Sequence, residues 1–142
     1  MSAAYDGRCH CGAIGFRYRT PLPPADWPVR ACQCSFCRAH EVISTSHPSA
    51  SIEFHADDLT TLQRYRFGLK TADFLTCGRC GVYIGAVLES DAGAFGIVNL
   101  RALTQAPVGL EAAASVSYDD EDAAGRVDRR EERWAAVTGL PW

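Results

Sequence analysis

The 142-residue sequence predicts a mainly β domain that ends in one short helix. Two observations support this fold class. Short segments of alternating apolar and polar residues recur along the chain, separated by Gly, Pro, Asp or Ser, as is typical of strands joined by turns. Helical periodicity is found only in the last part of the chain. Since 142 residues suit one compact domain and no low-complexity linker marks a second, we expect one domain over 1–142, with 119–142 as a helical extension packed on it.

The first strand expected from alternation is 13–20, in which positions 14, 16 and 18 are apolar and face one way. The proline-rich segment 21–28 follows as a loop, because proline cannot donate a hydrogen bond in a central strand. His55 stands among polar residues and is expected in a loop. The other expected strands are short and bounded by turn residues: 61–67, 74–76, 82–88, 94–101 and 113–118.

The last segment has the pattern of a helix. Acidic residues at 119–122 suit a helix start, where they complement the positive end of the helix dipole. Four residues then follow at helical spacing: Val127, Glu131, Trp134 and Val137. Gly139 and Pro141 are a stop signal. The sequence therefore predicts a short C-terminal helix that packs on the sheets through Trp134.

Charge and apolar runs argue against two classes of partner. The formal net charge is −3 and the sequence pI is about 5.7, and the basic residues form no block, so we expect no nucleic acid partner. The longest apolar run, 82–88, is far shorter than a membrane span, so we expect no membrane partner. These features favour a small molecule as the partner.

Seven cysteines are the unusual feature of the composition. An odd number cannot pair completely into disulfides, and no secretory segment follows Met1, which favours a reduced, cytoplasmic protein. The cysteines form three short motifs: Cys9-x-Cys11, Cys32-x-Cys34-x-x-Cys37 and Cys77-x-x-Cys80. A Cys-x-x-Cys turn places two sulfurs on one side of a tight knuckle, so these motifs predict zinc binding.

Seven cysteine ligands divide into a closed site of four thiolates and an open site of three. The three central cysteines are close enough in sequence to surround one ion unaided. The three-cysteine group is then Cys32, Cys34 and Cys37, and the four-cysteine group is Cys9, Cys11, Cys77 and Cys80. Spacing also allows Cys9 and Cys11 to exchange with two central cysteines. His40, three residues after Cys37, could close the second site as a fourth ligand.

The order of the motifs resembles the glutathione-dependent formaldehyde-activating enzyme family, which includes centromere protein V-like proteins. The segments that carry the resemblance are CHCG at 9–12, CQCSFCR at 32–38 and CGRCG at 77–81, and 98–101 is similar to the late strand of the family. The resemblance implies coiled antiparallel β-sheets around zinc knuckles, a fold shared with a zinc-binding Rab accessory factor. It also implies a structural zinc on the four-cysteine group and a catalytic zinc on the three-cysteine group. The sequence departs from the family at Glu41-Val42, where a glycine is common.

The resemblance therefore implies a carbon–sulfur lyase similar to S-(hydroxymethyl)glutathione synthase, with glutathione or another thiol and formaldehyde as reactants. Two zinc ions per chain are expected, the central one more easily lost because it has three ligands. Four sulfurs around one zinc carry excess negative charge, and Arg38, next to Cys37, is the expected compensating cation, with Arg30 second. The alternative is a non-enzymatic protein-interaction module in which both zinc ions are structural.

Two aromatic residues near the central cysteines have competing interpretations. Phe36 lies within the motif, and we expect it to pack the turn into the core rather than line a pocket. Trp27, in the proline-rich loop, is equally compatible with the core and with a substrate cleft.

Overall fold

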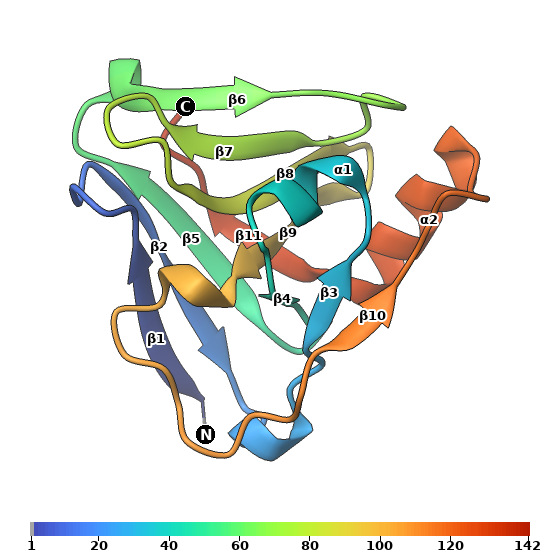
Figure 1. Ribbon diagram of the computed structural model, residues 1–142, viewed down its shortest axis with the longest axis horizontal. Coiled ribbons are helices and arrows are strands. Elements are labelled where there is room, and N and C mark those ends of the chain that lie inside the picture. The colour runs from blue at the N-terminus through green and yellow to red at the C-terminus, as the bar shows by residue number, and fades with distance from the viewer. Residues whose placement is uncertain (1) are drawn as a thin grey trace.

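Between residues 2 and 142, which this computed structural model describes, the chain forms eleven strands, two α-helices and three short 3-10 turns (Figure 1). The predicted mainly β class with a short C-terminal helix is confirmed. The strands are β1 Ala3–Arg8, β2 Ile14–Thr20, β3 Arg30–Cys32, β4 Ser44–Thr45, β5 Ser51–Ala56, β6 Leu62–Tyr65, β7 Asp73–Cys77, β8 Tyr83–Ser90, β9 Gly93–Asn99, β10 Ala114–Val116 and β11 Ala135–Gly139. The helical elements are η1 Pro24–Asp26, α1 Ser35–Ala39, η2 Leu59–Thr61, η3 Leu100–Ala102 and α2 Ala123–Arg133.

The strands join one mixed sheet that branches at β9. The main path runs β1-β2-β5-β11-β9-β4-β3-β10, and a second path, β8-β7-β6, leaves the other edge of β9. Neighbours joined by short turns, such as β1 with β2 and β8 with β9, are antiparallel. The pairs β11–β5 and β10–β3 are parallel, because long connections bring the chain back in the same direction.

The core confirms the alternation of the first predicted strand. In β2, Ile14, Phe16 and Tyr18 are buried, whereas Arg17 and Arg19 point to solvent. Burial of such large apolar side chains contributes about 1.5–3 kcal/mol each to stability. The proline-rich loop 21–28 contains only the short turn η1, as expected.

The position predicted for His55 is wrong. His55 lies in β5, which pairs with β2 on one side and β11 on the other. Ile52 and Phe54 face the core and alternate with the exposed Glu53 and His55, which is the pattern of a half-buried strand. His55 was expected in a loop because the polar residues on the solvent face of this strand have the composition of a loop.

The C-terminal segment forms a helix and then a strand. The Asp122 carboxylate accepts the Gly125 backbone N–H at 2.7 Å and begins α2, as the acidic stretch predicts. The predicted helix is too long at its C-terminal end: α2 ends at Arg133, and Val137, which was expected in the helix, lies in β11. Backbone pairing with β5 and β9 outweighs the local helical pattern there. Trp134 is buried in one cluster with Ala86 and Leu88 of β8 and with Ala72, which precedes β7, and it therefore packs on the sheet as predicted.

Figure 1 shows α2 on the side of the molecule opposite to β1, next to β10 and β3. Within residues 2–142 we find no helix that is long and apolar enough to cross a membrane.

Candidate metal centres

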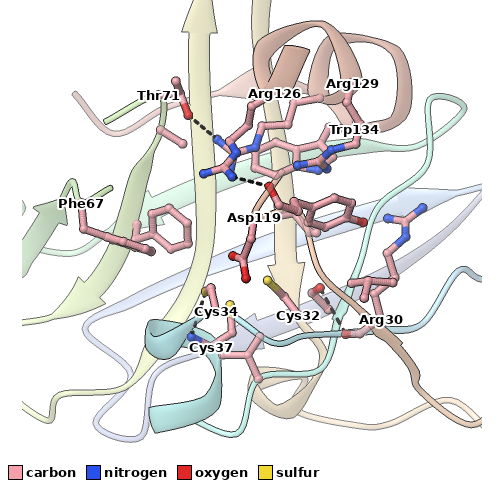
Figure 2. Close-up of a pocket in the computed structure, with 18 of the residues that line it drawn as sticks. Arg30, Cys32, Cys34, Cys37, Phe67, Thr71, Asp119, Arg126, Arg129 and Trp134 are labelled. Atoms are coloured by element: carbon pink, nitrogen blue, oxygen red, sulfur yellow. Dashed lines mark hydrogen bonds between the residues drawn. The ribbon is translucent and has the colours of Figure 1, made fainter. Parts of the chain in front are cut away.

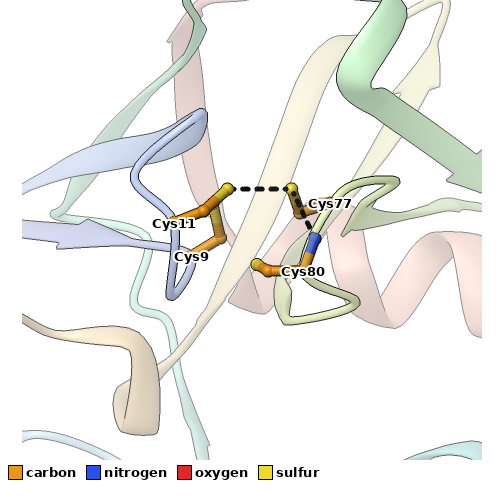
Figure 3. Close-up of side chains that lie close together, drawn as sticks. All are labelled: Cys9, Cys11, Cys77 and Cys80. Carbon is orange, nitrogen blue, oxygen red and sulfur yellow. Dashed lines mark hydrogen bonds between the residues drawn. The ribbon is translucent and has the colours of Figure 1, made fainter.

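The four-cysteine group joins two segments that are distant in sequence. Cys9 and Cys11 lie in the turn between β1 and β2, whereas Cys77 ends β7 and Cys80 lies in the turn between β7 and β8 (Figure 3). Their four sulfurs lie within 4.8 Å of one another. The Cys9 and Cys11 sulfurs are 3.7 Å apart, and those of Cys11 and Cys77 are 3.6 Å apart. Tetrahedral zinc with bonds of about 2.3 Å separates its sulfurs by about 3.8 Å, so the group fits this metal.

Backbone N–H groups support these sulfurs. The Ile14 N–H donates to the Cys9 sulfur at 3.4 Å, and the Cys80 N–H donates to the Cys77 sulfur at 3.4 Å. Such donors disperse the negative charge of metal-bound thiolates. The cysteine turns are therefore suited to hold the charged form of their side chains.

The surroundings shift the pKa values of two cysteines of the four-cysteine group in opposite directions. Burial raises the pKa of Cys9 to about 11. Burial alone would also raise the pKa of Cys80, but the N–H groups of Cys11 and Val82 outweigh it and lower that pKa to about 6. The surroundings therefore favour the thiolate form more at Cys80 than at Cys9. A bound metal ion would allow all four sulfurs to lose their protons.

The three-cysteine group is local in sequence. Cys32 ends β3, Cys34 is the N-cap of α1 and Cys37 lies in that helix. The Cys37 N–H donates to the Cys34 sulfur at 3.4 Å, so this sulfur takes the place of the oxygen found in most helix caps. The three sulfurs lie within 4.8 Å of one another, which suits a zinc ion with one further coordination position.

The three thiols also interact strongly with one another. Contacts with the Cys32 and Cys37 thiols lower the pKa of Cys34, whereas contacts with Cys32 and Cys34 raise the pKa of Cys37. The three thiols therefore do not ionise independently of one another. A bound cation would favour the thiolate form of all three.

The two groups coincide with the partition preferred from spacing. The exchange of Cys9 and Cys11 with central cysteines does not occur, because the groups contain no mixed members. His40 is not a member of either group. Its ring packs on Phe36, with ring centres 4.5 Å apart.

A pocket of about 110 Å³ opens beside the three-cysteine group. Figure 2 shows the three cysteines on one side of it, with Arg126, Arg129 and Trp134 across from them. Apolar side chains from β7, β8 and the segment before β7 complete much of the remaining wall. No such pocket accompanies the four-cysteine group among the best-formed cavities of residues 2–142.

The positive charge of the pocket does not come from Arg38. Arg38 is exposed on α1 and lies outside the residues that line the pocket. Arg30, the second choice, does line it, together with three arginines of α2 that sequence reasoning missed: Arg126, Arg129 and Arg130. A signal for them was present, since their spacing of three and four residues places them on one face of a helix.

The two aromatic residues with competing interpretations both belong to packing clusters. Trp27 is 3% exposed, its ring meets those of Tyr5 and Tyr18 edge-on, and its indole N–H donates to the Leu22 carbonyl. Trp27 is therefore a core residue. Phe36 packs among several aromatic rings around α1, as expected, and does not line the pocket.

The departure at Glu41 has a structural counterpart. Glu41 has a φ angle of 50°, in the left-handed region that favours glycine. The turns of the four-cysteine group use glycine in this conformation, at Gly12 (φ 83°) and Gly81 (φ 81°). The Glu41 carbonyl accepts a hydrogen bond from the Arg101 side chain, which helps to hold the turn.

These features define the chain as a β protein with two cysteine groups that could hold metal ions, one of them beside a pocket. Comparison with known proteins specifies the family. Residues 4–119 match the family described as glutathione-dependent formaldehyde-activating enzyme, and the chain belongs to this family.

The chain is also similar to two individual proteins. A Halomonas elongata protein named "Putative glutathione-dependent formaldehyde-activating enzyme" is 48% identical over 33 residues, which are 23% of this chain and 19% of that protein. The match thus spans about a fifth of the length of that relative. A crystal structure of a Rhodobacter sphaeroides protein is similar with a TM-score of 0.59 and 27% identity, covering 78% of this chain and 99% of that one.

Proposed function

We propose that the three-cysteine group is the active site of a zinc-dependent enzyme that condenses glutathione, or a related thiol, with formaldehyde. The observation that carries this proposal is the position of three mutually close sulfurs in the wall of a pocket. The family description supplies the identity of the two reactants. In reverse, the same reaction cleaves a carbon–sulfur bond and is a lyase reaction.

Zinc held by three thiolates, with one open position, would supply a Lewis acid that favours the thiolate form of a neighbouring thiol. The chain contributes the ligands Cys32, Cys34 and Cys37 on a short, hydrogen-bonded turn. Phe74, Tyr83 and other apolar side chains of the pocket exclude water from the space next to them. The pocket is lined by more arginine than acidic side chains, and the excess raises the local positive potential, which also favours an anionic sulfur.

The reaction needs no oxidant or reductant. The thiol sulfur forms a bond to the formaldehyde carbon while the carbon–oxygen π bond breaks. The proton that the thiol loses is balanced by the proton that the new hydroxyl gains. The product is an S-hydroxymethyl thioether, and the reverse reaction restores both reactants.

The four-cysteine group is proposed as a structural zinc site, because its ligand set is complete without a substrate. None of the seven cysteines forms a disulfide. This agrees with a reducing compartment, and we propose the cytoplasm, as expected from the sequence.

The test uses NMR to measure the rate of exchange between free glutathione and its hydroxymethyl adduct. The rate of the spontaneous reaction, recorded without protein, is the background. Zinc-loaded protein should accelerate exchange, and Cys34→Ala should lower the acceleration at least about 100-fold. The matched control is Gln33→Ala, which changes an exposed neighbour in the same turn and should leave the acceleration unchanged. Equal acceleration by Cys34→Ala and the natural protein would overturn the proposal.

The alternative of a protein-interaction module required a second site closed by protein ligands. His40 does not join the three-cysteine group, so no observation favours this alternative over the enzyme.

A further inference from the structure

The pocket wall that faces the three-cysteine group is formed by α2 and is strongly basic. Arg30 joins the three arginines of α2, whereas the acidic residues in reach are Asp119 and Glu121. Figure 2 shows the Asp119 carboxylate turned toward the cysteines rather than toward the arginine side chains. Residues 123–133 lie outside the segment that matches the family, so the family description does not explain this wall.

Arg129 is already paired with a carboxylate of the protein. Its Nε and Nη2 donate to the two Glu121 carboxylate oxygens at 2.8 and 3.1 Å. Its guanidinium carbon also lies 3.5 Å from the centre of the Tyr118 ring. The charge of Arg129 is thus neutralised within the protein, and this residue contributes little to the attraction of a ligand.

Arg130 is in the opposite situation. It is only 8% exposed. Within residues 2–142, no carboxylate lies within ion-pair distance of its guanidinium, and its Nε has no hydrogen-bond partner. Its Nη1 donates to the Thr71 hydroxyl at 2.8 Å, and the guanidinium lies over the Trp134 ring. Burial and then the neighbouring Arg129 and Arg126 lower its pKa to about 10.

A buried cation beside other cations is costly unless an anion accompanies it. Arg126 is a second cation of this wall, and its charge is only partly neutralised by the protein. Its Nη2 donates to the Tyr118 carbonyl at 2.7 Å, and its Nε contacts Glu121 at 3.4 Å, a carboxylate that Arg129 holds more closely. The wall therefore has positive charge and donor capacity left over.

We propose that Arg130 and Arg126 bind a carboxylate of the thiol substrate, so that the enzyme selects thiols that carry a carboxylate. This inference rests on the proposed function, because it takes the neighbouring cysteines as the sulfur site. Both walls line one cavity of about 110 Å³, which is small compared with the roughly 300–1,000 Å³ of most ligand pockets. It would enclose the sulfur end and one carboxylate of a larger thiol such as glutathione and leave the remainder outside.

The first test uses S-methylglutathione, whose sulfur is blocked and which therefore probes the carboxylate site without the reaction. Its binding to the zinc-loaded protein is measured by calorimetry. Arg130→Met should weaken binding by about tenfold or more, as expected for the loss of a charge-assisted hydrogen bond. The matched control is Arg133→Met, an exposed arginine of the same helix outside the pocket, which should leave binding unchanged within about twofold.

Because Arg130 packs on Trp134, its replacement could disturb the fold. Thermal unfolding of each variant is therefore recorded, and Arg126→Met provides an independent variant at a less buried position, with the same direction of effect expected. Inorganic phosphate is titrated as a competitor to test whether a free anion occupies the site. Binding of S-methylglutathione that is equal in the natural protein and both folded variants overturns the inference. Phosphate that binds in the same arginine-dependent way while S-methylglutathione does not bind also overturns it.

The second test compares 3-mercaptopropionate with its amide as thiol substrates. The natural protein should prefer the acid by about tenfold in kcat/KM, and Arg130→Met should lose this preference. Loss of reaction with every thiol, together with arginine-dependent binding of S-methylglutathione, would overturn the proposed function and keep the carboxylate site. If the acid and the amide react at equal rates, the carboxylate site is overturned and the proposed function is kept.

Discussion

The two cysteine groups have similar ligands but opposite surroundings. The four-cysteine group connects two turns more than sixty residues apart, and its own sulfurs complete a tetrahedral set. The three-cysteine group is confined to one turn and helix, and its open side meets a pocket. In the proposed function, the number of ligands and the sequence distance between them separate the site that holds the fold together from the site that accepts the substrate.

The largest expected effect distinguishes the groups by stability. Cys77→Ser should remove zinc from the four-cysteine group and lower the free energy of unfolding by about 5 kcal/mol or more, since structural zinc binding is coupled to folding. Cys34→Ala should cost only about 1–2 kcal/mol, because the three-cysteine group joins no distant segments. Zinc content and chemical denaturation check both values, and equal losses would remove the distinction.

Metal removal should separate the groups in the natural protein. A chelator added in steps should first extract one zinc ion per chain, from the three-cysteine group, because that site has fewer protein ligands. The catalysed exchange should fall to background at this stage while the circular dichroism spectrum is retained. Simultaneous loss of both metals with unfolding would contradict the separate roles.

A smaller effect is expected in β7, which ends at Cys77 and also lines the pocket through Phe74. Asp73 is buried there and accepts hydrogen bonds from Arg66 at 2.7 Å and Arg64 at 2.9 Å. Burial alone would raise its pKa, but these arginines outweigh burial and lower it. Because both arginines are partly exposed, we expect Asp73→Asn to cost only about 1–2 kcal/mol.

The pH dependence of this effect has a definite sign. The lowered pKa means that the contribution of Asp73 is fully present above the pKa of the unfolded carboxyl, about 3.8, and is lost as the pH falls through the folded value. The stability difference between the natural protein and Asp73→Asn should be constant near neutral pH and shrink in acid. Denaturation at several pH values measures it, and a difference that grows in acid would refute the assignment.

The smallest effects concern the left-handed residues beside the two groups. Gly81→Ala should destabilise the protein by about 1 kcal/mol, because the added side chain has room but φ is 81°. Glu41→Gly should be neutral or stabilising by up to about 1 kcal/mol, since the glycine relieves the strained φ of 50° but is more flexible when unfolded. Thermal unfolding of the two variants provides the comparison.

Local patterns explain what could be predicted from the sequence. The alternation in β2 and the spacing of the cysteines each involve neighbours along the chain, and both were sufficient to find the elements concerned. The tail was harder, because Trp134 and Val137 continue the helical spacing although the sheet takes Val137 as a strand residue. Only the pairing of β11 with distant strands decides that position.

The same reasoning applies to the site. The cysteine ligands could be proposed because each motif is short, whereas the choice of Arg38 as the compensating cation relied on sequence proximity alone. The structure brings Arg126 and Arg130 to the pocket from nearly one hundred residues away. Their place depends on how α2 packs on the sheet, which no local pattern specifies.

The position of β11 has a consequence for folding during synthesis. Residues 135–139 lie between β5 and β9, so the middle of the sheet stays open until this segment has left the ribosome. During synthesis β5 and β9 would expose unpaired backbone edges, which are prone to wrong pairing. The cysteine turns are all made earlier, and capture of zinc by the growing chain would hold the two halves near each other until the final strand arrives.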